Sequence, residues 1–427
     1  MIRISVLILL LFVSACSRPS EQPAAAGPAA NTTAPVAVAR VPSFDAGRML
    51  ADIKTLSSNE FEGRAPGSKG EDLTVTYLEE QFKKIGLQPG NTDGTFVQSL
   101  PLVGITASNT RPLTVSGNGK KATFKWRDDL VAWTKRVTDT SSLENSELIF
   151  AGYGVTAPEF KWDDFKDVDV KGKTIVVLVN DPQIPSASDP SQLDPSMFNG
   201  KAMTYYGRWT YKFEEGARRG AAGILIVHET GPAGYPFSVV QGNLNERFDL
   251  VTPDKKMGRA SIEGSVSLDA AKKILSMAGQ DFDALKKQAL TREFRPVPLG
   301  LQASVAIRNT LRTIQSRNVL AKLEGSDPQL RNEWVIYTAH WDHLGIGAPV
   351  NGDKIYNGAL DNASGVAQVL EIARAFTAVE PRPKRSVLFL MVGAEERGLL
   401  GSQHYAQQPV YPLAKTLAAI NVDGVNQ

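Results

Sequence analysis

The sequence contains little of what disulfide-bonded or nucleic-acid-binding proteins need. Its 427 residues include one cysteine, Cys16, and only four histidines. A lone cysteine leaves no intrachain disulfide, so stability must come from the core and from any bound metal. Lys and Arg number 47 against 45 Asp and Glu, a net charge of +2, with no long run or cluster of one sign. This balance argues against a nucleic-acid partner, because a broad binding surface needs clustered positive charge.

The apolar run near the N-terminus is too short to span a bilayer as a helix. It extends from Ile4 to Val13 behind Arg3, which suits the core of a signal peptide. The run ends in Val13-Ser14-Ala15-Cys16, which resembles the lipobox of bacterial lipoproteins. The resemblance implies that residues 1–15 are removed, that Cys16 is the lipidation site, and that the protein is exported to the cell envelope or periplasm as a membrane-anchored lipoprotein. The alternative is an ordinary signal peptide with an incidental cysteine.

The following segment has the composition of a linker. Residues 16–42 are rich in Ala, Pro, Ser and Thr and carry few large apolar residues. Such a segment buries too little surface to fold, so we expect a disordered tether. The rest of the chain is too long for one ordinary domain.

Three folded segments are expected after the tether. Residues 43–140 contain a helical pattern from Asp72 to Ile85, which Gly86 ends. Residues 141–297 change to short apolar runs typical of strands, including Lys173 to Val179 and Gly223 to Val227.

Residues 298–427 read as an α/β domain. Three apolar runs of strand length, at 334–339, 386–392 and 416–422, alternate with an amphipathic helix at 365–376. The first and third segments are expected to form one mixed sheet flanked by helices, which the second segment interrupts.

Ionisable residues follow the ends of these predicted strands. His340 and Asp342 come after the first strand, Glu395 and Glu396 after the second, and Asp423 after the third. Asp361 precedes the amphipathic helix. Because open α/β sheets bind ligands at the carboxyl ends of their strands, we expect these groups at one edge.

A divalent cation would neutralise the repulsion among so many carboxylates. A mixed set of His, Asp and Glu favours zinc over magnesium or calcium, which prefer oxygen alone. The acidic groups exceed what one tetrahedral zinc requires, which two metals sharing a carboxylate would explain.

Four motifs, in order, resemble those of the M28 family of zinc peptidases. They are His340-x-Asp342, Asp361-Asn362-Ala363-Ser364-Gly365, the segment from Ala394 to Ser402, and Asn421-x-Asp423. The resemblance implies the zinc-exopeptidase fold, a phosphorylase/hydrolase-like mixed α/β sheet flanked by helices. It also implies an aminopeptidase that removes N-terminal residues from peptide substrates.

The resemblance also implies a role for each residue of these motifs. His340 and Asp423 would bind the first zinc, Glu396 the second, and Asp361 would bridge both. Asp342 would accept a hydrogen bond from His340 and fix its tautomer. Glu395 would be the general base that takes a proton from the attacking water.

The middle segment resembles the protease-associated domain, a β-rich insert that carries no catalytic residues in its family. The matching sequence segments are Phe150 to Gly154, Asp169 to Lys173 and Ala217 to Val227. We therefore expect this insert to gate the substrate or to serve packing only.

One expected ligand is missing. M28 peptidases complete the second zinc site with a further His beyond the Asn-x-Asp motif, but no His follows His404 here. We therefore expect a C-terminally truncated chain, which binds at most one zinc tightly and has little activity.

Simpler interpretations remain for single residues. Glu395 and Glu396 alone would suit a solvated loop, and Asp361 a helix cap. The family resemblance requires only the first His of the pair His340 and His343, so we do not expect His343 to be a ligand. His228 and His404 have no partner motif, and we expect them to be structural or surface residues.

Alternatives to an aminopeptidase stay open. The fold also suits a carboxypeptidase or a glutaminyl cyclase, and a truncated chain could be a non-catalytic relic or binding module. The sequence does not indicate the oligomeric state.

Overall fold

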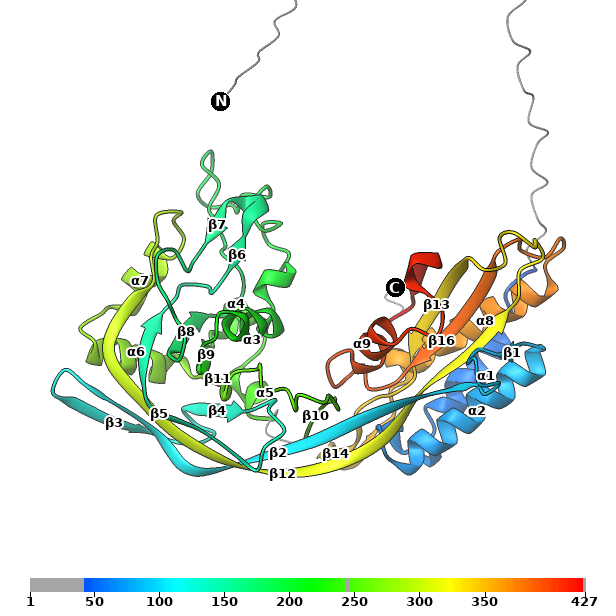
Figure 1. Cartoon of the computed structure of the whole chain (residues 1–427), viewed down its shortest axis with the longest axis horizontal. Helices are drawn as coiled ribbons and strands as arrows, with labels where there is room; N and C mark the ends of the chain where they lie inside the picture. The colour runs from blue at the N-terminus through cyan, green and yellow to red at the C-terminus, as the bar shows by residue number, and fades with distance from the viewer. Residues whose placement is uncertain (1–41, 243–245, 425–427) are drawn as a thin grey trace, which may run out of the picture. The chain divides into compact units, whose positions relative to one another are not determined.

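A computed structural model describes residues 42–242 and 246–424 (Figure 1). The predicted signal peptide, Cys16 and all but the last residue of the predicted tether lie outside these ranges. Within them, no helix is long and apolar enough to cross a bilayer.

Four neighbouring strands form the part of the sheet that carries the predicted ligands. Their order is β17 (Thr416–Asn421), β13 (Trp334–His340), β16 (Ser386–Val392) and β12 (Val297–Leu323). The first three are parallel, and β12 runs antiparallel to β16. Each of the three predicted apolar runs is thus a strand, to within one residue at its ends, and their carboxyl ends lie at the same edge.

Helices cover both faces of this part of the sheet. Along β16, Val387, Phe389 and Met391 join the core under α1 (Ala46–Leu56), α2 (Lys69–Ile85) and α8 (Ser364–Ala378). Leu388 and Leu390 point to the other face, towards α9 (Leu400–Gln407) (Figure 1). A parallel strand buried on both faces is apolar throughout, which explains why these runs do not alternate with polar residues.

The ends of α2 follow from its sequence. The side chain of Ser68 accepts a hydrogen bond from the Glu71 N–H and caps the first turn. Gly86 ends the helix at a φ of 85°, in the left-handed region that glycine adopts without strain. The predicted helix at 72–85 is therefore confirmed, with a start three residues earlier than predicted.

Two long strands join the ligand-bearing part of the sheet to the inserted segment. Strand β2 (Val97–Gly117) pairs antiparallel with β12 along most of its length. The same β12 pairs with β16 near one end and with β5 (Thr140–Phe150) near the other. A single 13-stranded sheet therefore contains strands of both parts.

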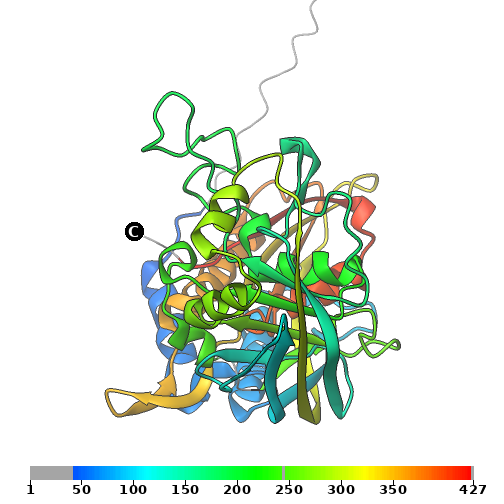
Figure 2. The same cartoon turned by 90° about the vertical axis from the view of Figure 1, so that its left-hand side faces the viewer.

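The inserted segment continues the sheet with parallel strands. Its order runs through β5, β8 (Thr174–Leu178), β9 (Gly223–Val227) and β11 (Ile262–Val266). Strand β4 (Leu130–Trp133), which precedes this segment in the sequence, pairs antiparallel with β11 at the end. Residues of α6 (Leu268–Met277) pack on one face and Phe213 of α3 (Trp209–Arg218) on the other. Figure 2, turned by 90°, shows the short helices of this segment against its strands.

The remaining elements are short. The other strands are β1 (Gln88–Pro89), β3 (Lys120–Phe124), β6 (Thr156–Ala157), β7 (Trp162–Asp163), β10 (Arg247–Leu250), β14 (Gly345–Val350) and β15 (Asp353–Tyr356). The other α-helices are α4 (Thr230–Ala233), α5 (Phe237–Gly242) and α7 (Phe282–Gln288). Short 3₁₀ or π-helical segments lie at 59–64, 158–160, 205–207, 359–363 and 413–415. The fold is a mixed α/β sheet flanked by helices with a β-rich insertion, as the sequence predicted.

Candidate metal centre

The predicted ligands meet where the parallel strands end. His340 is the last residue of β13, Glu395 and Glu396 follow β16, and Asp423 follows β17. Asp361 lies in the irregular turn at 359–363, directly before α8. Neighbouring parallel strands place their carboxyl ends together, and with the turn before α8 four distant segments deliver these side chains to one place.

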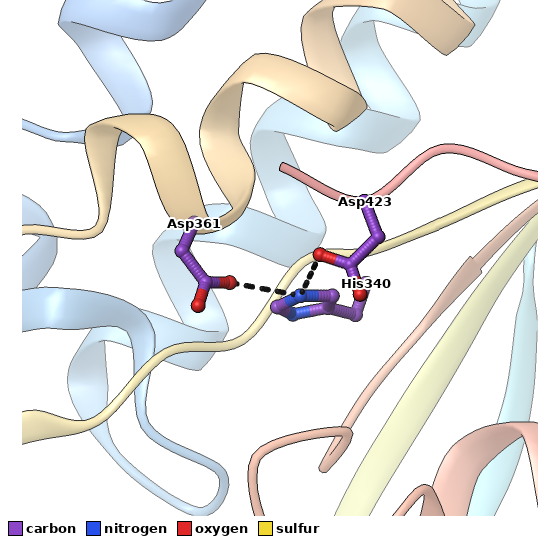
Figure 3. Close-up of side chains that lie close together, drawn as sticks. All are labelled: His340, Asp361 and Asp423. Atoms are coloured by element: carbon purple, nitrogen blue, oxygen red, sulfur yellow. Dashed lines mark ion pairs between the residues drawn. The ribbon is translucent and has the colours of Figure 1, made fainter. Parts of the chain in front are cut away.

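Two carboxylates converge on the imidazole of His340 (Figure 3). Its Nε2 lies 3.0 Å from Asp361 Oδ1 and 3.4 Å from Asp423 Oδ1. This nitrogen is buried and makes no hydrogen bond with any residue in the described ranges. Bond lengths of about 2.05 Å and a tetrahedral angle put two ligands of one zinc about 3.3 Å apart. The spacing around Nε2 is therefore that of ligands around a common ion.

The other nitrogen of His340 fixes the tautomer. Its Nδ1 lies 3.0 Å from the backbone carbonyl oxygen of Asp342, and a carbonyl can only accept. Nδ1 therefore donates, and in the neutral form of the ring the lone pair is on Nε2, which faces the site. Burial lowers the pKa of His340, but the negative charges of Asp342, Glu395 and Asp423 outweigh burial and raise it overall.

Asp342 contacts His340 through its backbone carbonyl, and its carboxylate has other partners. Its carboxylate Oδ1 is 3.8 Å from His340 Nδ1, too far for a hydrogen bond. Oδ1 instead accepts from the backbone N–H of Glu395 at 2.9 Å, and Oδ2 accepts from that of Glu396 at 3.3 Å. Burial raises the pKa of Asp342 to about 6. The backbone carbonyl of Asp342 orients the imidazole, and its carboxylate holds the loop that follows β16.

Glu395 and Glu396 have different surroundings although they are adjacent. Glu395 Oε2 lies 3.9 Å from His340 Nε2, and burial raises the pKa of this carboxyl to about 7. Burial also raises the pKa of Glu396, but hydrogen bonding and attraction from His343 lower it overall. One carboxyl is thus suited to exchange protons near neutral pH, and the other is kept ionised.

His343, which sequence reasoning set aside, lies in the same cluster. Its Nδ1 is 2.6 Å from Glu396 Oε1. Candidate ligand atoms of His343, Asp361 and Glu396 all lie within 4.8 Å of one another, as do those of His340, Asp361 and Asp423. Asp361 belongs to both groups, which fits a carboxylate shared between two metal positions.

Arg64 holds the loops beneath the cluster. Its buried guanidinium donates to the backbone carbonyls of Leu56, Trp341, Asn357 and Gly358, at 2.6 to 2.8 Å. These bonds connect the end of α1, the residue after His340 and the turn that leads to Asp361. Burial lowers the pKa of Arg64 to about 10, so the group stays charged at neutral pH.

Asn362 joins two of the ligand-bearing segments. It is fully buried, and its Nδ2 donates to the Val422 carbonyl at 2.9 Å. Its Oδ1 accepts from the N–H of Gly365 at 3.0 Å and of Gly424 at 3.3 Å. The amide therefore hydrogen-bonds the first turn of α8 and also the residues on either side of Asp423. Sequence reasoning had placed Asn362 only within the motif at 361–365 and had not singled out Arg64.

These residues fit zinc. Each group of three offers one imidazole and two carboxylates, the donor set that zinc accepts and that magnesium and calcium do not prefer. The buried Nε2 of His340 is the strongest single indication. It makes no hydrogen bond within the described ranges, yet the carboxylates of Asp361 and Asp423 stand 3.0 and 3.4 Å from it, the spacing of ligands around one ion.

Comparison with known proteins agrees with this chemistry. Residues 318–427 match the sequence model of Peptidase family M28. All six predicted site residues fall within this range.

The curated relatives share this region. Aminopeptidase NAALADL1 of Mus musculus is 31% identical over 170 residues, 36% of this chain and 21% of the relative. A probable zinc metalloprotease of Pyrenophora teres f. teres is 36% identical over 107 residues, 25% of this chain and 22% of the relative. Leupeptin-inactivating enzyme 1 of Streptomyces exfoliatus is 34% identical over 130 residues, 29% of this chain and 27% of the relative. The chain thus spans roughly a quarter of the length of these relatives.

Among solved structures, an aminopeptidase from Aneurinibacillus sp. strain AM-1 is 21% identical, with a TM-score of 0.46. The alignment covers 90% of this chain and 71% of the aminopeptidase chain. The zinc aminopeptidase BSAP of Bacillus subtilis is 19% identical, with a TM-score of 0.38. The alignment covers 90% of this chain and 70% of the BSAP chain. The part of the chain that supplies every predicted metal ligand, residues 318–427, thus matches the M28 peptidase family.

Proposed function

We propose that this chain is a zinc-dependent exopeptidase, most specifically an aminopeptidase with a two-zinc site. The observation that carries the proposal is the buried Nε2 of His340, with Asp361 at 3.0 Å and Asp423 at 3.4 Å. The match to Peptidase family M28 over the same residues supports it.

The chain's own residues divide the work of binding. His340 and Asp423 would hold one zinc, Glu396 the other, and Asp361 both. Zinc, when bound, polarises the scissile carbonyl and makes water more acidic. The Asp342 carboxylate keeps the Glu395–Glu396 loop against the site through two backbone N–H groups.

Glu395 is proposed as the general base. Its carboxylate stands 3.9 Å from His340 Nε2 and its side chain is 25% exposed, so it reaches both the metal position and solvent. It would accept the proton of the attacking water and then deliver that proton to the leaving amine. A group with a pKa near the working pH performs both transfers well.

The test is hydrolysis of an aminoacyl p-nitroanilide by Glu395→Gln. We expect kcat to fall at least about 100-fold, the usual contribution of a general base, with zinc content unchanged. Glu293→Gln, at an exposed position in the inserted segment, is the matched control and should keep full activity. Unchanged turnover in Glu395→Gln would exclude Glu395 as the base.

Peptides with a blocked N-terminus separate the alternatives within the fold. An aminopeptidase needs the free amine, so acetylation should abolish cleavage. Cleavage unaffected by the block would favour a carboxypeptidase, and cyclisation of an N-terminal glutamine would favour a glutaminyl cyclase. Absence of turnover in a zinc-loaded chain would favour a binding module.

We also propose that the protein is an exported lipoprotein anchored through Cys16. The support is the order of Arg3, the apolar run and the lipobox-like tetrapeptide in the sequence. Labelling of cells with a radioactive fatty acid should mark the wild-type protein and not Cys16→Ser. Equal labelling of both would contradict this proposal.

Residues 141–297 are proposed to be a protease-associated insert that gates the substrate. Trp209, at the start of α3, is 39% exposed, and under this proposal it would contact longer peptides. If the insert gates access, Trp209→Ala should change kcat/KM for longer peptides and leave an aminoacyl p-nitroanilide unaffected. Equal effects on both substrates would contradict gating.

A further inference from the structure

The imidazole of His343 is held in one place by its surroundings. Its Nδ1 lies 2.6 Å from Glu396 Oε1, and its side chain is only 13% exposed. On the other side the ring packs against Gly358, where an added Cβ would stand 2.6 Å from Cγ of His343. Gly358 has a φ of 61°, so both its conformation and this contact require glycine.

Two carboxylates face this imidazole. Glu396 is directly beside it, and Asp361 completes a group whose candidate ligand atoms all lie within 4.8 Å. The group has the same composition as the one around His340: one imidazole and two carboxylates, with Asp361 common to both. Three protein ligands with one open position are the usual arrangement of a catalytic zinc.

The distance between His343 and Glu396 decides how the site would change on binding. At 2.6 Å the two groups share a proton in a hydrogen bond. Two ligands of one tetrahedral zinc stand about 3.3 Å apart, so zinc would replace the proton and separate the atoms by about 0.7 Å. The Glu396 side chain, whose exposed fraction is 17%, would have to rotate for this movement.

We propose that His343 is a ligand of the second zinc, together with Asp361 and Glu396. This inference rests on the proposed zinc-peptidase function and deepens it, because it supplies the second site with an imidazole from the strand β13 side. It also revises the expectation from the sequence that the chain alone holds at most one zinc tightly.

The competing explanation is that His343 only orients Glu396 by a hydrogen bond. Two substitutions separate the explanations. His343→Asn keeps an N–H donor close to the position of Nδ1 but removes the imidazole ligand. His343→Ala removes both. The matched control is His228→Gln, which removes an imidazole from the inserted segment and keeps a donor for the Tyr235 carbonyl that His228 contacts at 3.0 Å.

The experiment measures zinc per folded chain after dialysis against a zinc buffer, with the affinity of each site from competition with a chelator. Circular dichroism confirms that each variant is folded. We expect two zinc ions for the wild type and His228→Gln, and one for His343→Asn and His343→Ala. The second dissociation constant should rise more than about 100-fold, beyond the 10- to 100-fold cost of losing a group that only orients a ligand.

Each other outcome overturns the inference. Two zinc ions in His343→Asn with one in His343→Ala would show a hydrogen-bonding role only. Two in both variants would show no role in binding. A wild-type chain that binds one zinc would refute the second site but leave the His340 site intact. A wild-type chain that binds none would refute the proposed function itself.

Discussion

Asn362→Ala removes the amide that joins α8 to the strand end carrying Asp423. The fully buried side chain bonds the Val422 carbonyl at 2.9 Å and the Gly365 N–H at 3.0 Å. Alanine leaves both backbone groups without these partners. A buried polar group left unsatisfied costs about 1–3 kcal/mol, so the two together predict a loss of about 2–6 kcal/mol in the free energy of unfolding.

The same change should weaken zinc binding. Without the amide, the hydrogen bonds that join Val422 and Gly424 to the Asp361 turn are lost, and the strand end is held by the pairing of β17 with β13 and by the packing of Val422. Asp423 would then spend time away from His340, and the first site would lose one of three ligands. We expect the dissociation constant for zinc to rise about 10- to 100-fold, the range typical of groups that orient a ligand.

Asn180→Ala is the control for this prediction. Asn180 is also buried and also bonds backbone groups, the Pro232 carbonyl at 3.0 Å and the Asp181 N–H at 2.8 Å, but it lies in the inserted segment. Urea denaturation should show a comparable loss of stability in both variants, whereas chelator competition should show weaker zinc binding in Asn362→Ala alone. Equal zinc affinities in the two variants would refute the reasoning.

Three further predictions concern Arg64, Glu371 and the metal. Arg64→Lys loses the planar fork that binds four carbonyls, so the free energy of unfolding should fall by at least about 2 kcal/mol; an unchanged urea midpoint would contradict this. Burial raises the pKa of Glu371, but hydrogen bonds from Arg48, the Asp45 N–H and Arg374 lower it to about 2. The ionised carboxylate therefore stabilises the fold fully above its ordinary pKa of 4.5, and this contribution is lost as the pH falls towards 2. The stability difference between wild type and Glu371→Gln should accordingly shrink from pH 6 to pH 2, and a constant difference would refute the role of the charge. Removal of zinc by a chelator should lower the melting temperature, because the carboxylates then repel one another. Added zinc should restore the melting temperature and added magnesium should not. Equal restoration by both ions would contradict the assignment to zinc.

The sheet around the centre could be predicted because its signal is local. The runs that became β13, β16 and β17 are apolar and of strand length, and their parallel arrangement brings the following residues together. The convergence of His340 and Asp423 follows from that topology, whereas Asp361 reaches the site from the turn before α8. The strands β2 and β12 gave no such signal. Their 21 and 27 residues far exceed an ordinary strand, and β2 contains Pro101 and Pro112.

Contacts that depend on side-chain orientation could not be predicted. The partner of His340 Nδ1 is a backbone carbonyl, and no sequence pattern distinguishes it from the carboxylate of the same residue. His343 meets Glu396 only because the loop after β13 folds back against Gly358. Arg64 is more than 270 residues from Trp341, whose carbonyl it binds. Such long-range contacts leave no periodic signal in the sequence.

Anomalous diffraction at the zinc absorption edge, from crystals of the zinc-loaded chain, tests the central claim most directly. The account predicts a peak bounded by His340 Nε2 and the carboxylates of Asp361 and Asp423, at about 2.0–2.2 Å from each ligand. Zinc found only at surface positions, with none beside His340, would contradict it.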